Sequence, residues 1–193
     1  MGYTPRGCGR DHGVVRRQDY LVVLAEGGRF PGDGLCRVAA PLSDDSGNYN
    51  LHVLLYNHRG NGTTHYGNFG VLYNMADRDN FDFVLLVLRP SAQWRCYQTG
   101  AMIDGRVDWF GSYTGPCAAG TRIRGATWYN VTVTSRIYRN TTVLLDGQPI
   151  VQPIIRHQRR GHVGVVVTNG WDNTVYFKQL AVRKTTSGRR HLV

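Results

Sequence analysis

The chain has very little glutamate. Among the 13 acidic residues in its 193 positions, only Glu26 is a glutamate. Hydrolysis of a glycosidic bond normally uses a pair of carboxylates, which here would have to be built from aspartates. The sequence also lacks a Gly-x-Ser-x-Gly nucleophile motif and a histidine group with the spacing of metal ligands. These absences argue against an enzyme, so we expect a protein without catalytic activity.

Lysine is almost as scarce. Only Lys178 and Lys184 are lysines among 23 basic residues, and the formal net charge is +10. The other basic residues are arginines, whose planar guanidinium group can bind carboxylate, phosphate or sulfate through two hydrogen bonds. We therefore expect a polyanionic glycan as a ligand of the densest cluster, with a solvated loop as the alternative. Nucleic acid is disfavoured because no zinc-finger, helix-turn-helix or RNA-binding signature is present. The candidate anion ligands of the cluster are Arg156, Arg159 and Arg160.

Long apolar runs are absent, so the sequence predicts no transmembrane helix, and its first residues lack the apolar core of a signal peptide. No Cys-x-x-Cys spacing occurs either, which disfavours a zinc or thiol redox site. The four cysteines allow three pairings, and we favour Cys96 with Cys117 and Cys8 with Cys36 because each closes a local loop. Buried free thiols are the alternative. Disulfides favour an oxidising, extracellular compartment, in which the chain would be a mature form.

Three Asn-x-Thr triplets agree with that location, because such triplets accept N-linked glycans in secreted proteins. Their asparagines are Asn61, Asn130 and Asn140.

Two apolar runs around one polar connection form the clearest local pattern. Between residues 70 and 87, segments rich in Val, Leu, Tyr and Phe flank Asp77, Asp79 and Asn80, which predicts a β-hairpin. Asp77 and Asp79 are interpreted as turn formers, with oxygen ligands for calcium as the weaker alternative. No other cofactor is expected.

The same alternation recurs along the chain. Apolar residues occupy every second position of 129–134, which is the period of a strand with one wet face. Asp146-Gly147 predicts a tight hairpin turn, and the strands around Asn169-Gly170 are expected to form another hairpin. We therefore predict an all-β chain with a two-sheet antiparallel sandwich over 18–184 and tails at 1–17 and 185–193. The expected core includes Val71, Tyr73, Phe81, Phe83, Val131, Val133, Val165, Val167 and Phe177.

These segments resemble a known family. The hairpin at 70–87, the strand at 128–133, the turn at 144–147 and the late strands from 161 to 177 follow the order seen in concanavalin A-like jelly-roll domains. The resemblance covers roughly 66–183 and is strongest to the laminin G-like and keto-disaccharide hydrolase-related branch. It implies two facing antiparallel sheets that often bind glycans, but the family contains enzymes, lectins and adhesion modules alike.

Aromatic residues give the candidate sugar ligands, because the apolar face of a pyranose stacks on indole and phenol rings. Trp109, Tyr113 and Trp171 lie in polar, glycine-rich segments, where a loop anchor is the competing interpretation. Trp128 opens an alternating strand and is assigned to the core. The resulting hypothesis is a secreted, non-catalytic carbohydrate-binding or adhesion module whose partner is a glycan or an extracellular protein. A structural building block of an extracellular assembly and a glycan-active hydrolase or lyase are the alternatives.

The cysteine pattern makes a direct prediction. Mass mapping without reductant should find Cys96 joined to Cys117 and Cys8 to Cys36, and reduction should lower the melting temperature, since each cross-link stabilises by roughly 3 kcal/mol. Four alkylatable thiols in the unreduced native protein would refute the pairing.

Overall fold

The computed structural model describes twelve segments of the chain, and every structural statement below refers to them. These are residues 4–6, 14–16, 20–25, 35–41, 48–58, 68–77, 79–87, 97–109, 123–136, 139–150, 162–168 and 173–184. The expected tail at 185–193 lies outside the described residues, and so do Asn169 and Gly170.

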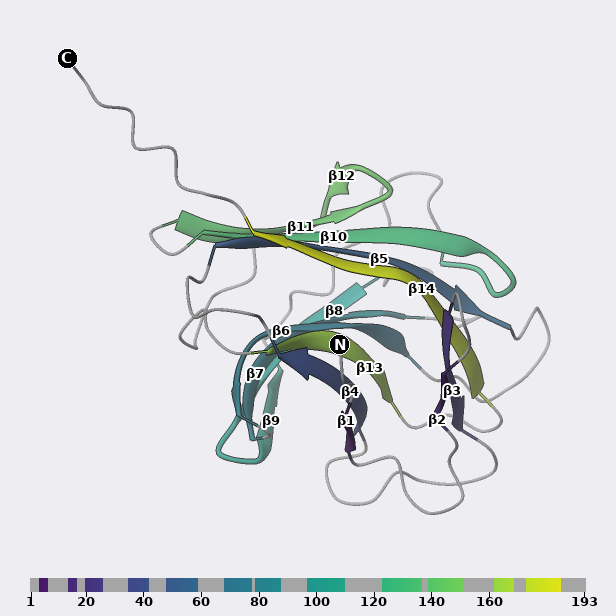
Figure 1. Cartoon of the computed structure of the whole chain (residues 1–193), viewed down its shortest axis with the longest axis horizontal. Helices are drawn as coiled ribbons and strands as arrows, with labels where there is room; N and C mark the ends of the chain where they lie inside the picture. Colours follow the sequence, from purple (N-terminus) through teal and green to yellow (C-terminus); the bar gives the residue numbers. More distant parts are fainter. Residues whose placement is uncertain are drawn as a thin grey trace.

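The described strands form two antiparallel sheets that face each other (Figure 1). Sheet A has the order β1 (Thr4–Arg6), β4 (Leu35–Pro41), β13 (His162–Thr168), β6 (Phe69–Asp77), β7 (Asn80–Leu86), β8 (Tyr97–Ile103) and β9 (Arg106–Trp109). Sheet B has the order β12 (Gln148–Pro149), β11 (Arg139–Leu145), β10 (Trp128–Arg136), β5 (Tyr49–Asn57), β14 (Asn173–Lys184), β3 (Tyr20–Ala25) and β2 (Val14–Arg16). The all-β sandwich predicted from the sequence is confirmed.

Side-chain alternation decides which residues fill the space between the sheets. Along β5 and β10, buried residues alternate with half-buried ones, because one face of sheet B packs inward and the other faces outward. Strands β6 and β7 are buried on both faces over most of their length. All nine residues expected in the core are buried. Most of them lie between the sheets, whereas Phe81 and Phe83 belong to a second apolar cluster on the other face of sheet A.

Two predicted turns are present. In the β6–β7 hairpin the Asp77 carboxylate accepts hydrogen bonds from the Asp79 backbone N–H at 2.8 Å and from the Asn80 amide at 3.0 Å. In the β11–β12 turn, Asp146 and Gly147 both have positive φ, at 49° and 80°. Asp and Gly tolerate this conformation better than other residues, which is why the dipeptide signals a tight hairpin.

The expected hairpin between β13 and β14 is wrong. Strand β13 pairs with β4 and β6 in sheet A, whereas β14 pairs with β3 and β5 in sheet B, so the chain crosses between the sheets at this point. Alternation shows that a segment is a strand with a buried face, but it does not show which strand is its partner.

The expected N-terminal tail contains two strands. Strand β1 pairs with β4 and β2 pairs with β3, so residues 4–6 and 14–16 extend opposite sheets at their edges. Each strand has only three residues, which is too short for an alternating apolar pattern to stand out in the sequence. The sandwich therefore begins earlier than residue 18.

Cys36 lies on β4 and is 1% exposed. The described part of the chain contains no free cysteine. Cys8, Cys96 and Cys117 lie outside the described residues, so the two proposed pairings stay predictions.

A buried polar network joins the two sheets. The Tyr49 hydroxyl on β5 donates to Asn74 Oδ1 on β6 at 3.0 Å and accepts a hydrogen bond from the Asn74 backbone N–H at 3.1 Å. The Asn74 side-chain amide donates to Asp82 Oδ2 at 2.8 Å, and Ser135 Oγ on β10 donates to Asn74 Oδ1 at 3.4 Å. Burial, followed by the charge of Asp82 and the proximity of Tyr49, raises the pKa of Tyr73 well above its usual value. These groups lie inside the core, where each polar atom needs a partner.

This network makes a stability prediction. Tyr49→Phe should lower the free energy of unfolding by about 1–3 kcal/mol, because it removes both bonds to Asn74 and leaves its buried N–H unsatisfied. Tyr56→Phe is the matched control, since the Tyr56 ring lies on the outer face of sheet B, and it should change stability by less than about 0.5 kcal/mol. Urea titrations of both variants give the comparison. Equal effects would show that the network does not join the sheets energetically.

Candidate functional site

Three aromatic side chains form a line across the outer face of sheet B. Trp128 on β10 is the cross-strand partner of Tyr56 on β5, and Tyr56 is the partner of Tyr176 on β14. The ring centroids of Tyr56 and Trp128 are 4.9 Å apart, and those of Tyr56 and Tyr176 are 5.8 Å apart. We call Trp128, Tyr56 and Tyr176 the aromatic row.

Two further side chains border this row. His58 follows Tyr56 at the end of β5 and lies 6.5 Å from the Tyr56 ring and 6.2 Å from the Tyr176 ring. The Lys178 ammonium group lies 5.2 Å from the centroid of the Trp128 ring, within the range of a cation–π contact. The cation over the indole helps to fix the ring and places a positive group on the row itself.

The backbone around the row is held in place by hydrogen bonds. The Ala126 N–H donates to the Asn57 carbonyl at 2.8 Å, and this ties the turn before β10 to the end of β5. The buried Tyr129 hydroxyl accepts a hydrogen bond from the Arg124 N–H at 2.7 Å in the same turn. The His58 N–H donates to the Thr174 carbonyl at 2.8 Å, which ties β5 to β14. The row is therefore a preorganised surface, and binding on it requires little ordering of the backbone.

Trp128 is the exposed member of the row, and its assignment to the core is wrong. It is 40% exposed, and every other large hydrophobic side chain among the described residues is more buried. The alternation of β10 already contained this result. Tyr129, Val131 and Val133 face inward, so Trp128 must share the outward face with Asn130. Tyr56 and Tyr176, which sequence reasoning did not single out, follow from the same alternation once the strand register is known.

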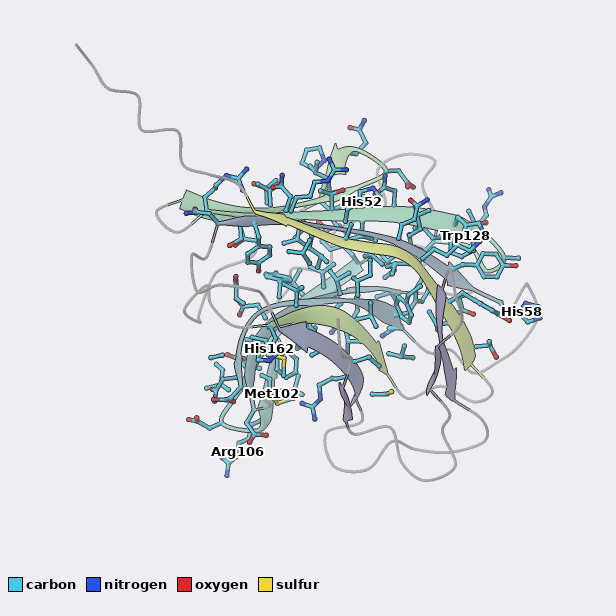
Figure 2. All side chains as sticks on the ribbon, in the orientation of Figure 1. His52, His58, Met102, Arg106, Trp128 and His162 are labelled. Carbon is cyan, nitrogen blue, oxygen red and sulfur yellow. The ribbon has the colours of Figure 1, made fainter. Side chains whose placement is uncertain are left out.

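Polar side chains continue the same face beside the row. Asn130 and Thr132 follow Trp128 at alternate positions of β10, with Thr132 Oγ1 donating to Asn130 Oδ1 at 3.4 Å, and His52 is the cross-strand partner of Thr132. Figure 2 shows His52 and Trp128 on the side of sheet B that faces away from sheet A. Asn130 lies on this polar face, as expected, and its glycosylation stays a prediction. Aromatic rings next to hydroxyl, amide and imidazole groups are the combination that sugar sites use.

Most of the ligand and glycosylation residues that the sequence predicts have side chains that the structure does not describe. The backbone of Trp109 ends the edge strand β9, but its side chain is not described. The other proposed ligands and two sequon positions fall outside the described side chains, so their roles stay predictions. These are Tyr113, Trp171, Arg156, Arg159, Arg160, Asn61 and Asn140.

Asp77 and Asp79 form the β6–β7 turn, in agreement with the favoured interpretation. Within the described segments, no group of three or more His, Cys, Asp or Glu residues could hold a metal ion, so calcium binding by these two residues stays a prediction without further ligands to support it. The same segments contain no helix that is both long and apolar enough to cross a membrane.

Comparison with known proteins places the fold. No family model matches the sequence. The structure is similar to the carbohydrate-binding module CBM66 from Bacillus subtilis, with a TM-score of 0.66, 14% sequence identity, and coverage of 95% of this chain and 96% of that one. It is also similar to the metal-free carbohydrate recognition domain of Emp46p, with a TM-score of 0.59, 9% identity, and coverage of 95% and 88%.

A third similar structure is a putative glycosyl hydrolase from Parabacteroides distasonis, with a TM-score of 0.52, 10% identity, and coverage of 96% of this chain and 100% of that one. The chain therefore has the concanavalin A-like jelly-roll fold of lectins and carbohydrate-binding modules, as its sequence motifs indicated. At these identities the likeness concerns the fold alone.

Proposed function

We propose that this protein is a non-catalytic carbohydrate-binding module and that the aromatic row is its sugar-binding surface. The observation that carries the proposal is the line of Trp128, Tyr56 and Tyr176 across three neighbouring strands, on a face that presents Leu54 and a series of polar groups beside them. The Tyr56 and Trp128 rings pack against each other at an inclination of 35°, so the apolar platform of the row is chiefly the exposed part of Trp128. A pyranose ring stacks its apolar face on such a platform and directs its hydroxyls to neighbouring polar groups.

The comparisons support the same class of function, since proteins named for carbohydrate binding share this fold. The proposal that the protein is non-catalytic rests on the carboxylates that could act as general acid and base. The chain has one glutamate, Glu26, and Asp77 is engaged in turn hydrogen bonds. An extracellular location and glycan modification are proposed from the four cysteines and three sequons. In this view the protein attaches to a glycan or a glycan-bearing partner outside the cell.

Replacing the exposed indole tests the proposal. Trp128→Ala should weaken binding to a retained polysaccharide by at least about tenfold, because an exposed tryptophan that anchors a binding surface commonly contributes about 2 kcal/mol or more. Affinity gel electrophoresis against soluble glucans, xylan, galactan and fructans identifies the retained polysaccharide and measures the loss. Trp128→Phe should keep part of the affinity because it preserves an aromatic ring.

The control is Phe83→Leu. Phe83 is buried in the apolar cluster on the other face of sheet A, so this substitution should alter stability without altering sugar affinity. A Trp128→Ala protein that is folded and migrates like the parent in every gel would remove the aromatic row as the binding surface.

The arginine cluster at 156–160 carries a separate proposal, a preference for anionic glycans. Replacing Arg156, Arg159 and Arg160 together by Ala should lower the salt concentration needed for elution from heparin, because guanidinium groups bind sulfate and carboxylate. Thermal melting of the triple variant should match that of the parent. Elution at an unchanged salt concentration would mean that the cluster is a solvated segment and that the net charge of +10 acts elsewhere or not at all.

A further inference from the structure

The acidic residues of the strands are distributed unequally between the two sheets. All strand carboxylates belong to sheet A, where they are Asp77, Asp82 and Asp108. The seven strands of sheet B contain no Asp or Glu. They do contain basic residues, namely Arg16, Arg136, Arg139, Lys178, Arg183 and Lys184. The sheet that carries the aromatic row is therefore the cationic sheet.

Two of these arginines lie at the end of the outer face opposite the aromatic row. Arg183 on β14 is the cross-strand partner of Asn50 on β5, and the Arg136 guanidinium on β10 donates to Asn50 Oδ1 at 3.2 Å. The two arginines thus flank Asn50 on the same three strands that carry the aromatic row. We call Arg136 and Arg183 the arginine pair.

The two arginines differ in how firmly they are held. Nη1 of Arg136 also donates to the Ser135 carbonyl at 2.8 Å and to the Tyr49 carbonyl at 3.3 Å, so this guanidinium is fixed. Arg183 is exposed and makes no hydrogen bond or ion pair with the described residues. A fixed guanidinium beside an exposed one offers hydrogen-bond donors to a carboxylate or sulfate group. Guanidinium groups bind such anions through short charge-assisted hydrogen bonds.

The distance between the two ends defines the shape of the ligand. Tyr56 and Asn50 are six positions apart on β5, which corresponds to roughly 20 Å at the rise of a β-strand. His52 and Thr132 lie on the outer face between them and can donate and accept hydrogen bonds. A single sugar cannot reach both ends, whereas an extended chain can.

We infer that the outer face of sheet B binds an extended acidic glycan, with one sugar stacked on the aromatic row and a carboxylate or sulfate further along the chain bound by the arginine pair. The inference rests on the proposed function and adds the substrate class to it. Charge complementarity favours an acidic chain over a neutral one, since the strands β5, β10 and β14 contain no carboxylate to repel it. The Asp146 carboxylate in the neighbouring β11–β12 turn accepts a hydrogen bond from the Asn130 N–H at 2.8 Å, which places it near the aromatic row and not near the arginine pair.

The test uses acidic polysaccharides and the same polymers with their carboxylates reduced to alcohols. Hyaluronan, alginate and polygalacturonate are the probes, each as a size series of oligosaccharides, and binding is measured by calorimetry. At least one acidic chain should bind more tightly than its carboxyl-reduced form, and the advantage should appear only for chains long enough to span the face. It should decrease with added salt, because the Debye length falls from about 10 Å at 0.1 M to about 3 Å at 1 M.

Arg183→Glu should lower the affinity for that acidic chain by about tenfold or more and leave the affinity for the reduced chain unchanged, since Arg183 is exposed and its replacement should not disturb folding. Arg106→Glu is the matched control. Arg106 is an exposed arginine at the start of the edge strand β9 of sheet A, and Figure 2 shows it on the opposite side of the molecule from His52. This variant carries the same change of net charge and should bind as the parent does.

Several outcomes overturn the inference. These are equal affinity for acidic and reduced chains, an Arg183→Glu protein that binds like the parent, and an Arg106→Glu protein that loses as much affinity. Loss of binding to a single-stranded oligonucleotide in Arg183→Glu, with glycan binding unchanged, would assign the arginine pair to nucleic acid instead. The proposed function is judged separately by Trp128→Ala. If this variant loses both chain types while Arg183→Glu loses neither, the sugar surface stands and only its acidic specificity fails.

Discussion

The hydrogen bonds around Asn74 connect the two sheets and constrain how one lies over the other. Apolar packing between sheets is non-directional, so the valines and leucines of this core do not by themselves fix one alignment. The contacts of Asn74 with Tyr49 and Ser135 are directional, and they join β6 of sheet A to β5 and β10 of sheet B. Strands β5 and β10 are two of the three strands that carry both the aromatic row and the arginine pair. The interior polar contact therefore fixes how sheet A lies behind the strands whose outer face carries both features.

The positive φ of Asn74, 52°, shows how this contact is made. The register between β6 and β7 shifts after Tyr73, so Asn74 lies in an irregularity of the strand. Bulges redirect side chains, and this one allows both Tyr73 and Asn74, which are successive in sequence, to face the space between the sheets. Asparagine tolerates the left-handed conformation and supplies both a donor and an acceptor, which few other residues combine. A strand without the irregularity would direct the Asn74 side chain to the opposite face of sheet A.

The sequence predicted much of this fold because alternation is a local property. The hairpin at 70–87, the Asp146-Gly147 turn and the buried positions of β10 all follow from the residues themselves. Strand pairing is not local, and for this reason the turn signal between β13 and β14 does not reveal that they belong to different sheets. The aromatic row is likewise non-local, because Tyr56, Trp128 and Tyr176 are far apart in sequence and meet only through the register of three strands. Of the three, only Trp128 has a local signal for its face, because it directly precedes the inward-facing Tyr129, whereas its apolar character alone favours the core.

The absence of acidic residues from the strands of sheet B has a consequence for the kinetics of encounter. A molecule with charge concentrated on one face turns that face toward an oppositely charged polymer before contact, so association is faster than a random search and slows with added salt. Dissociation depends on the short-range stacking and hydrogen bonds, which salt affects much less. On a fixed acidic matrix, such a protein would rebind quickly after each release. It could then remain near the matrix through many brief contacts, with its residence set by how often it returns.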